Sequence, residues 1–249
     1  LALSHVLGDA ELSLALDWRE KLQISQFVQQ FSARNDALSV LSLTPRARVP
    51  FQFGGLAHRV TLGIDWHSWR YDSRRDSAVQ NLGQPVNRLR ATQRTQGLYV
   101  QDLIELSKAT RLNLGWRGEQ ARLAANDSLD ATAPGFLGFQ QSAGRARDSQ
   151  NQRAWEFGVR HDLAREYTGY ARAGRSFRFA NVDEITSEFD ALGNPALQVL
   201  RAQHARTLEG GLEWRSGGHF LRAGLFRNDV MDEIHLDPFT PGVGNTNLP

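Results

Sequence analysis

The stretch Glu11-Leu-Ser-Leu-Ala-Leu-Asp-Trp-Arg19 decides the fold class of this chain. Leu12, Leu14, Leu16 and Trp18 occupy every second position, and mainly polar or small residues lie between them. Successive side chains of a β-strand point to opposite faces, so this segment has one apolar and one polar surface. A period of two predicts a strand rather than a helix.

The same alternation recurs along the chain, and helical periodicity is nearly absent. It is found in residues 59–66, 111–117, 155–160 and 208–214. The pattern predicts about ten strands, at residues 2–7, 10–21, 36–49, 57–72, 91–106, 109–122, 151–163, 166–178, 204–215 and 219–233. Residues 22–35 are the least defined part, because their turn fits at several places.

The connections between the predicted strands alternate in length. Short ones are expected at Gly8-Asp9, Ser107-Lys108, Ala164-Arg165 and Ser216-Gly-Gly218, and long polar ones at 73–90, 123–150, 179–203 and 234–249. Alternating strands with tight turns at one end and long loops at the other are typical of a transmembrane β-barrel. The predicted strands are also longer than those of most globular proteins and suit a tilted membrane crossing. A soluble β-sandwich, whose apolar face packs on a second sheet, is the alternative.

The composition excludes several classes of protein. Lys plus Arg is 29 and Asp plus Glu is 27, so the chain lacks the strong positive field of a nucleic-acid-binding protein. There is no cysteine, which rules out disulfides and thiolate metal sites. No apolar run is long enough for a membrane-spanning helix.

No arrangement of residues predicts catalysis. His161 and Asp162 are neighbours on a strand and are expected to point to opposite faces. The histidines, His58 and His67 among them, show no zinc-like spacing. Asp183-Glu184 fits a solvated loop pair. We therefore expect a protein that is not an enzyme and has neither a cofactor nor a metal site.

Binding is the better functional hypothesis, because arginines and aromatic residues gather around two of the long loops. Guanidinium groups and aromatic rings suit an anionic, ring-bearing metal chelate. The candidate ligand-binding residues are Trp69, Tyr71, Arg74, Arg88, Arg90, Phe136, Phe139, Arg145, Arg147 and Arg178. The competing interpretation is that the arginines keep the loops soluble and bind lipopolysaccharide phosphates.

Three stretches resemble the barrel of TonB-dependent outer-membrane receptors. Gln96-Gly-Leu-Tyr-Val-Gln-Asp102, followed by Leu112-Asn-Leu-Gly-Trp-Arg117, is similar to two consecutive strands of that family. Tyr167–Arg178, followed by Asn181-Val-Asp-Glu-Ile185, resembles a strand with a glycine-phenylalanine-arginine end, although here Arg175-Ser176 separates Gly174 from Phe177. Thr207-Leu-Glu-Gly-Gly-Leu-Glu-Trp214, continuing to Phe226-Arg-Asn-Asp229 and Ile234, resembles a further strand pair.

The resemblance implies an all-β fold, an antiparallel transmembrane β-barrel in the bacterial outer membrane. The family barrel has about 22 strands around a plugged lumen, so we expect residues 1–249 to form a single partial barrel domain. The plug domain, the motif that engages TonB and the last strands are expected to lie outside this chain.

The implied function is energy-coupled uptake of a ferric siderophore or a similar metal chelate. Cobalamin, haem and oligosaccharides remain open as ligands. The implied partners are the TonB complex, through the missing N-terminal region, and outer-membrane lipid with lipopolysaccharide; nucleic acid is not expected, and the receptor is expected to be monomeric. A passive porin and a soluble β-sandwich binding domain are the alternative functions.

Overall fold

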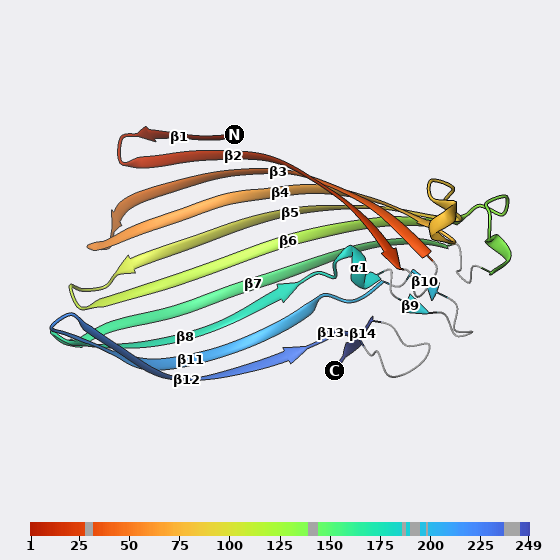
Figure 1. The fold of residues 1–249 in the computed structure, drawn as a ribbon. Helices are drawn as coiled ribbons and strands as arrows, with labels where there is room; N and C mark the ends of the chain where they lie inside the picture. Colours follow the sequence, from red (N-terminus) through yellow and green to blue (C-terminus); the bar gives the residue numbers. More distant parts are fainter. Residues whose placement is uncertain (28–31, 139–143, 186–187, 190–194, 198, 237–244) are drawn as a thin grey trace.

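The computed structural model is a single antiparallel sheet of ten strands with small additions at one end (Figure 1). It describes all residues except 28–31, 139–143, 186–187, 190–194, 198 and 237–244. The strands of the main sheet are β1 (Ala2–Leu7), β2 (Ala10–Phe27), β3 (Ser32–Phe53), β4 (Leu56–Asp76), β5 (Asn87–Glu105), β6 (Thr110–Leu129), β7 (Gly144–Ala164), β8 (Tyr167–Arg178), β11 (Gln203–Ser216) and β12 (His219–Met231). The additions are η2 (Val79–Asn81), η3 (Phe136–Gly138), α1 (Val182–Ile185) and two ribbons, β9 (Glu188–Phe189) with β10 (Pro195–Ala196) and β13 (Glu233–Leu236) with β14 (Asn245–Leu248).

The strands lie in the sheet in chain order, and each pairs with its neighbour in an antiparallel ladder. The tight turns that follow β1, β3, β5, β7 and β11 lie at one end of the sheet, and the long connections that follow β4, β6 and β8 lie at the other (Figure 1). Gly8, Gly217 and Gly218 have φ of 60°, 54° and 82° in these turns, values that residues with a side chain rarely adopt. The predicted alternation of short and long connections is confirmed, and Gly54-Gly55 adds one further tight turn, between β3 and β4.

All ten predicted strands are present, but several are longer than expected. β6 continues to Leu129 and β7 starts at Gly144, so the predicted loop 123–150 is strand over much of its length. β4 and β5 likewise extend into the predicted loop 73–90. In the uncertain stretch 22–35, β2 reaches Phe27 and β3 starts at Ser32, while residues 28–31 lie outside the described part. The extensions escaped prediction because their outward side chains are mainly polar or charged and their concave side is covered by the loops, so the alternation of hydropathy is reversed there.

The two faces of the sheet differ in chemistry. One cross-strand row runs through Leu12, Ala47, Leu62, Val100 and Trp116 on consecutive strands, because directly paired residues share a face. The rows beside it carry Ile64, which is 50% exposed, and Leu98, which is 52% exposed. We call this set of rows the apolar band.

No second sheet covers the apolar band in the described part of the chain, which argues against the β-sandwich alternative. The band is the surface that a barrel presents to lipid. No helix among the described residues is long and apolar enough to cross a membrane.

The buried core lies at the long-loop end, on the face opposite to the band. Tyr71 packs there with Leu89 and Ala91 and with α1, whose Ile185 is 2% exposed. Ala125 and Ala146 complete this cluster. The loops therefore cap the polar face of the sheet at this end and leave its middle open.

Candidate ligand-binding wall

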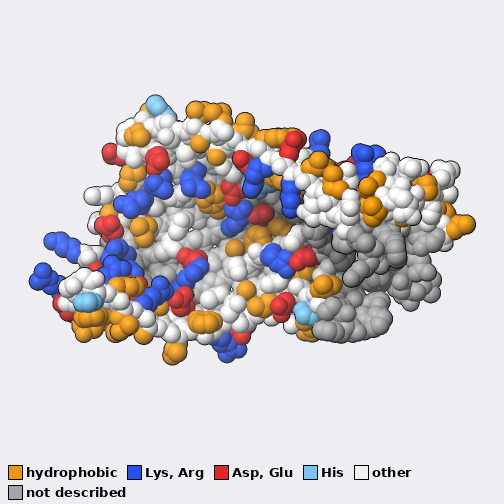
Figure 2. Space-filling view, viewed as in Figure 1, with side chains coloured by type: hydrophobic (Ala, Val, Ile, Leu, Met, Phe, Trp, Pro, Cys, Tyr) orange, Lys and Arg blue, Asp and Glu red, His pale blue; other side chains and the backbone are white. Residues whose placement is uncertain are grey.

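The polar face of the sheet is concave and carries acidic and basic side chains. Figure 2 shows a hollow between the first strands and the last strands, in which arginine and carboxylate side chains gather. The hollow has a volume of about 490 Å³. Residues from β3 to β11 line it, including Arg46, Asp65, Tyr99, Arg117, Glu156, Arg172 and Thr207. We call these seven residues the inner wall.

Tyr99 and Arg117 are held flat against the sheet by two glycines. A Cβ atom added at Gly63 would lie 2.4 Å from the Tyr99 hydroxyl oxygen, and one added at Gly97 would lie 2.9 Å from Arg117 Nη2. The Arg117 guanidinium carbon is 5.8 Å from the centre of the Tyr99 ring, a cation–π distance. The missing side chains therefore let a large ring and a guanidinium group lie along the wall instead of projecting into the lumen.

Most charges of the inner wall are paired. Arg117 donates to Asp65 and, over 2.8 Å from Nε, to Glu119. Arg172 forms an ion pair with Glu156. Arg46 differs, because it donates over 2.9 Å to the Tyr99 hydroxyl and has no acidic partner among the described residues. Arg46 is therefore the arginine of this wall whose charge is most available to an incoming anion.

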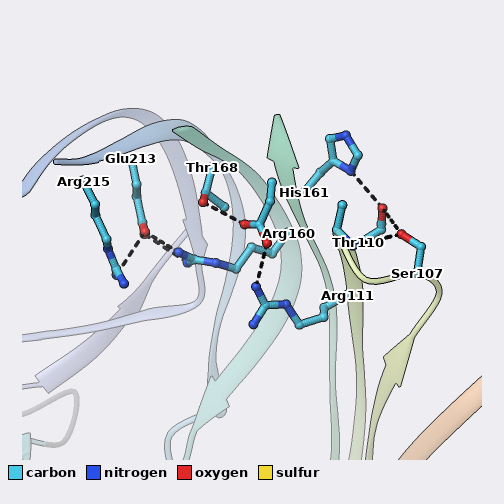
Figure 3. A network of polar contacts seen from close by, with 10 residues as sticks. Ser107, Thr110, Arg111, Arg160, His161, Thr168, Glu213 and Arg215 are labelled. Carbon is cyan, nitrogen blue, oxygen red and sulfur yellow. Dashed lines mark hydrogen bonds and ion pairs between the residues drawn. The ribbon is translucent and has the colours of Figure 1, made fainter. Parts of the chain in front are cut away.

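A second polar network lies near the short-turn end of the same face (Figure 3). Arg160 pairs with Glu213, which is 5% exposed, and Asp162 accepts from Thr168 over 2.8 Å and from Arg111 over 3.2 Å. These contacts link β6, β7, β8 and β11, and they help to fix the register of the strands that carry the inner wall. The charged and polar groups of this network bond to one another, so we assign the network a structural role.

His161 lies on the other side of β7 from Asp162. Its Nδ1 is 2.8 Å from the Thr110 hydroxyl oxygen (Figure 3). Asp162 instead accepts a hydrogen bond from the Thr168 hydroxyl group. The prediction that this dipeptide points to opposite faces is confirmed. Within the described residues no group of three or more histidine or acidic side chains is placed to hold a metal ion.

The structure divides the ten predicted ligand-binding residues. Five of them are on the convex face, on the same side as the apolar band and beyond its long-loop edge: Arg74, Arg88, Arg90, Arg145 and Arg147. Asp72 lies among the first three, 2.5 Å from Arg88 and 3.1 Å from Arg74. Burial alone would raise the pKa of the Asp72 carboxyl, but hydrogen bonds from Arg88 and Arg74 hold that pKa below its ordinary value. These five arginines face away from the hollow.

Of the other predicted residues, those on the concave side have structural partners. Trp69 and Tyr71 belong to the buried core, and Tyr71 donates over 2.8 Å to Asp36. Arg178 pairs with Glu184 over 2.7 Å and anchors the start of the connection after β8. Phe136 is the first residue of η3, and Phe139 lies outside the described residues.

The sequence pattern alone does not single out the inner wall as a binding site, although it assigns its residues to the polar face. Val100 and Trp116 are apolar strand positions, so alternation assigns their neighbours Tyr99 and Arg117 to the opposite, polar face. What the sequence lacks is the cross-strand register that brings Arg46 to Tyr99, 53 residues away.

The sequence itself identifies the family. Residues 8–248 match the family model described as TonB dependent receptor-like, beta-barrel. The chain belongs to this TonB-dependent receptor family. The family is one of receptors and transporters rather than enzymes, and it places the chain in the bacterial outer membrane. No curated protein matches the chain in sequence.

Solved structures of TonB-dependent receptors share the fold at low sequence identity. The alcaligin outer membrane receptor FauA of Bordetella pertussis is 19% identical with a TM-score of 0.67, covering 99% of this chain and 40% of its own. The siderophore receptor PiuA of Acinetobacter baumannii is 16% identical with a TM-score of 0.71, covering 98% of this chain and 41% of its own. The copper transporter OprC is 15% identical with a TM-score of 0.70, covering 96% of this chain and 39% of its own. The receptor chain described here thus spans about 40% of the length of the solved receptors that it matches.

Proposed function

We propose that this chain forms part of the lumen wall of a gated importer that takes up a ferric siderophore or a similar metal chelate. The observation that carries the proposal is the open, arginine- and tyrosine-bearing inner wall on the concave side of a TonB-dependent receptor barrel. Two similar structures, FauA and PiuA, are named as receptors for alcaligin and for a siderophore.

The chemistry of the wall suits an anionic chelate that must bind and then leave. Arg46 supplies a positive charge without an acidic partner among the described residues, and Tyr99 beside it supplies a hydroxyl group and an aromatic ring. The paired charges of Arg117 and Arg172 keep the rest of the wall close to neutral. One exposed guanidinium among neutralised pairs gives selective but weak contacts, which allow passage through a lumen.

By the same proposal, the receptor works as a monomer and obtains its energy from the TonB complex. The deciding experiment measures uptake of radioactive iron, loaded on hydroxamate, catecholate and carboxylate siderophores in turn, by cells that express the full-length protein as their only iron receptor. Uptake of at least one chelate that disappears when TonB is inactivated supports the importer. Iron uptake that is independent of TonB, together with ion conductance in planar bilayers, would establish the porin instead.

Removing the charge of Arg46 should weaken chelate binding. Arg46→Gln is expected to raise the half-saturating concentration for uptake about tenfold or more, because a hydrogen bond to a charged group contributes about 1.5–3 kcal/mol. Maximal uptake should change much less, since Arg46 does not act in energy coupling. Saturation curves of iron uptake measure both quantities.

Arg48→Gln is the matched control for this prediction. Arg48 lies two residues further along the same face of β3, but it pairs with Glu11 over 2.9 Å and is not among the residues that line the hollow. Equal half-saturating concentrations for Arg46→Gln and the unmodified receptor would refute the assigned role of the inner wall.

A further inference from the structure

One pair of ionisable side chains lies within the apolar band, on the face that the barrel presents to lipid. His58 on β4 is directly paired with Ile104, and Asp102 on β5 is directly paired with Val60 and with Leu114. The Nδ1 atom of His58 is 2.7 Å from the Oδ2 atom of Asp102. An ionisable side chain in the hydrocarbon region costs free energy and usually marks a functional site, so this pair requires an explanation.

The pair lies between the middle of the band and the short turns. His58 is four residues from Leu62 along β4. With Leu62 at the middle of the band, a rise of about 3.3 Å per residue and a strand tilt of about 40° place His58 roughly 10 Å from the midplane. The apolar band of an outer-membrane barrel is about 25 Å tall, so the pair lies inside the hydrocarbon, near the edge that faces the periplasm.

Two phenylalanines of the β3–β4 hairpin cover the imidazole ring. Phe51 stacks on His58 with ring centres 5.1 Å apart, and the Phe53 ring stands edge-on to it at 6.5 Å. The His58 side chain is 12% exposed and the Asp102 side chain is 21% exposed. His58 Nε2 and Asp102 Oδ1 are buried and have no hydrogen-bond partner among the described residues. Each of the two side chains therefore depends on the other for a polar contact.

No other charge on this face is close enough to compensate for either member of the pair. Arg59 and Glu105 are near along the two strands, but they have the opposite parity and point to the concave face. The next charged residues of the convex face on these strands are Arg70 and Arg94. The described parts of the flanking strands present uncharged side chains beside the pair, among them Ala47, Val49, Phe51, Leu112 and Leu114.

The pair fits the hydrocarbon only while it is neutral as a whole. A protonated His58 beside an ionised Asp102 carries no net charge. Removing the proton from the imidazole leaves an uncompensated carboxylate, and adding a proton to the carboxylate leaves an uncompensated imidazolium. Burial disfavours a lone charge, so the two groups are coupled in their protonation.

We propose that His58 and Asp102 share a proton and act as a pH-sensitive lock that holds the β3–β4 hairpin in the membrane. While the pair is neutral, Phe51 and Phe53 stay packed on the imidazole and the hairpin remains embedded. At lower or higher pH the pair acquires a net charge, which is drawn toward the water beyond the Gly54-Gly55 turn, and the hairpin loosens. The barrel is therefore most stable at intermediate pH.

The test compares variants of the full-length receptor that have been refolded into lipid vesicles. Asp102→Asn, His58→Gln and the double variant are unfolded in urea from about pH 4 to about pH 10, a range that covers the charge changes of carboxyl and imidazole groups. The other ionisable groups contribute the same background to every protein, so the differences between the pH profiles are compared. Heat-dependent migration on gels reports whether each barrel is folded.

His161→Gln is the matched control for these variants. His161 is a histidine of the same face, on β7, and it is directly paired with Thr110. Its Nδ1 contacts the Thr110 hydroxyl group, and the described residues provide it with no acidic partner. Its replacement should leave the pH profile of the receptor unchanged.

The two single variants are expected to depend on pH in opposite directions. Asp102→Asn leaves His58, which is uncharged only toward alkaline pH, so the equilibrium constant for unfolding should fall about tenfold or more as the pH rises. His58→Gln leaves Asp102, which is uncharged only toward acidic pH, so this constant should rise by a similar factor. The double variant should lose the stability maximum that the unmodified receptor has at intermediate pH.

Parallel pH profiles of the two single variants would overturn the proposal, because side chains that need not be neutral in the membrane add no slope of their own. Should one of these variants fail to fold, a stability maximum that persists in the double variant would overturn it as well. None of these results depends on which chelate is transported.

Discussion

Gly211→Ala is expected to destabilise the barrel by about 3 kcal/mol or more, while Gly210→Ala leaves its stability nearly unchanged. A Cβ atom at Gly211 would lie 2.3 Å from the backbone oxygen of Ala223 and 2.6 Å from the Tyr170 hydroxyl oxygen. The Ala223 oxygen cannot withdraw alone, because it belongs to the backbone of the directly paired strand β12, whereas the Tyr170 hydroxyl is the end of a side chain that reaches over from β8 on the other side. The substitution therefore forces β12 away from β11 or expels the tyrosine.

Expelling Tyr170 would remove further contacts. Its hydroxyl accepts a hydrogen bond from Arg222 Nε over 2.9 Å, and the Arg222 guanidinium carbon lies 4.3 Å from its ring centre. The ring crosses β11 and β12 where Gly211 and Gly224 are paired, so two missing side chains make its place. An aromatic ring over strand glycines is a known way of stabilising a sheet.

Gly210 provides the control because it differs from Gly211 only in the face that it occupies. A Cβ atom there would meet its nearest heavy atom, the backbone oxygen of Tyr170, at 3.5 Å, an ordinary contact. Urea-dependent refolding of the two full-length variants into detergent micelles measures the difference in the free energy of unfolding. A difference below about 0.5 kcal/mol would contradict the argument.

Much of the fold could be predicted from the sequence, because a period of two assigns each strand residue to a face. The alternation predicts one apolar face, which carries every second residue from Leu12 to Trp18 and from Val60 to Trp66. The structure confirms that face. The short turns were also recognised, since Gly8 and Gly217-Gly218 have the left-handed backbone that such turns require.

The ends of the strands were predicted poorly for a physical reason. Beyond the membrane the convex face meets polar headgroups and water, so Arg90, Arg94 and Arg122 replace leucine and tryptophan there. The concave face is then covered by loops, so it carries buried residues such as Leu89 and Ala91. Beyond the membrane edge the apolar residues therefore lie on the concave face and the polar residues on the convex face. A search for strands with an apolar convex face ends at that edge.

The inner wall depends on information that alternation does not contain. Its seven residues come from strands between β3 and β11, and only the register of each hairpin decides which of them meet. The alternation of side chains along each strand assigns both Arg46 and Tyr99 to the polar face. Their contact follows from two further hairpin registers, Arg46 with Gly63 and Gly63 with Tyr99.

An arginine in the middle of the apolar band should have the second large effect. Leu62→Arg is expected to destabilise the barrel by about 2–4 kcal/mol, the cost of a cationic side chain on the lipid face at the bilayer midplane. Leu62 is 44% exposed, and its directly paired neighbours on this face are Ala47 and Val100. None of these side chains offers a counter-charge or a hydrogen bond to the guanidinium group.

The matched control places the same new charge on the other face of the neighbouring strand. Gln101 pairs with Thr61, the residue before Leu62, so Gln101→Arg inserts the guanidinium group at the same height in the barrel. There it faces the polar hollow, and its loss is limited to one exposed hydrogen bond from Gln101 to Asn113. Refolding into lipid vesicles should separate the two variants by at least about 2 kcal/mol, because only one of the charges must be buried in hydrocarbon. Equal stabilities would mean that the convex face does not contact lipid. Such a result would contradict the membrane-barrel fold. A loss of stability confined to Leu62→Arg would instead show that the convex face of the sheet contacts lipid and the concave face does not.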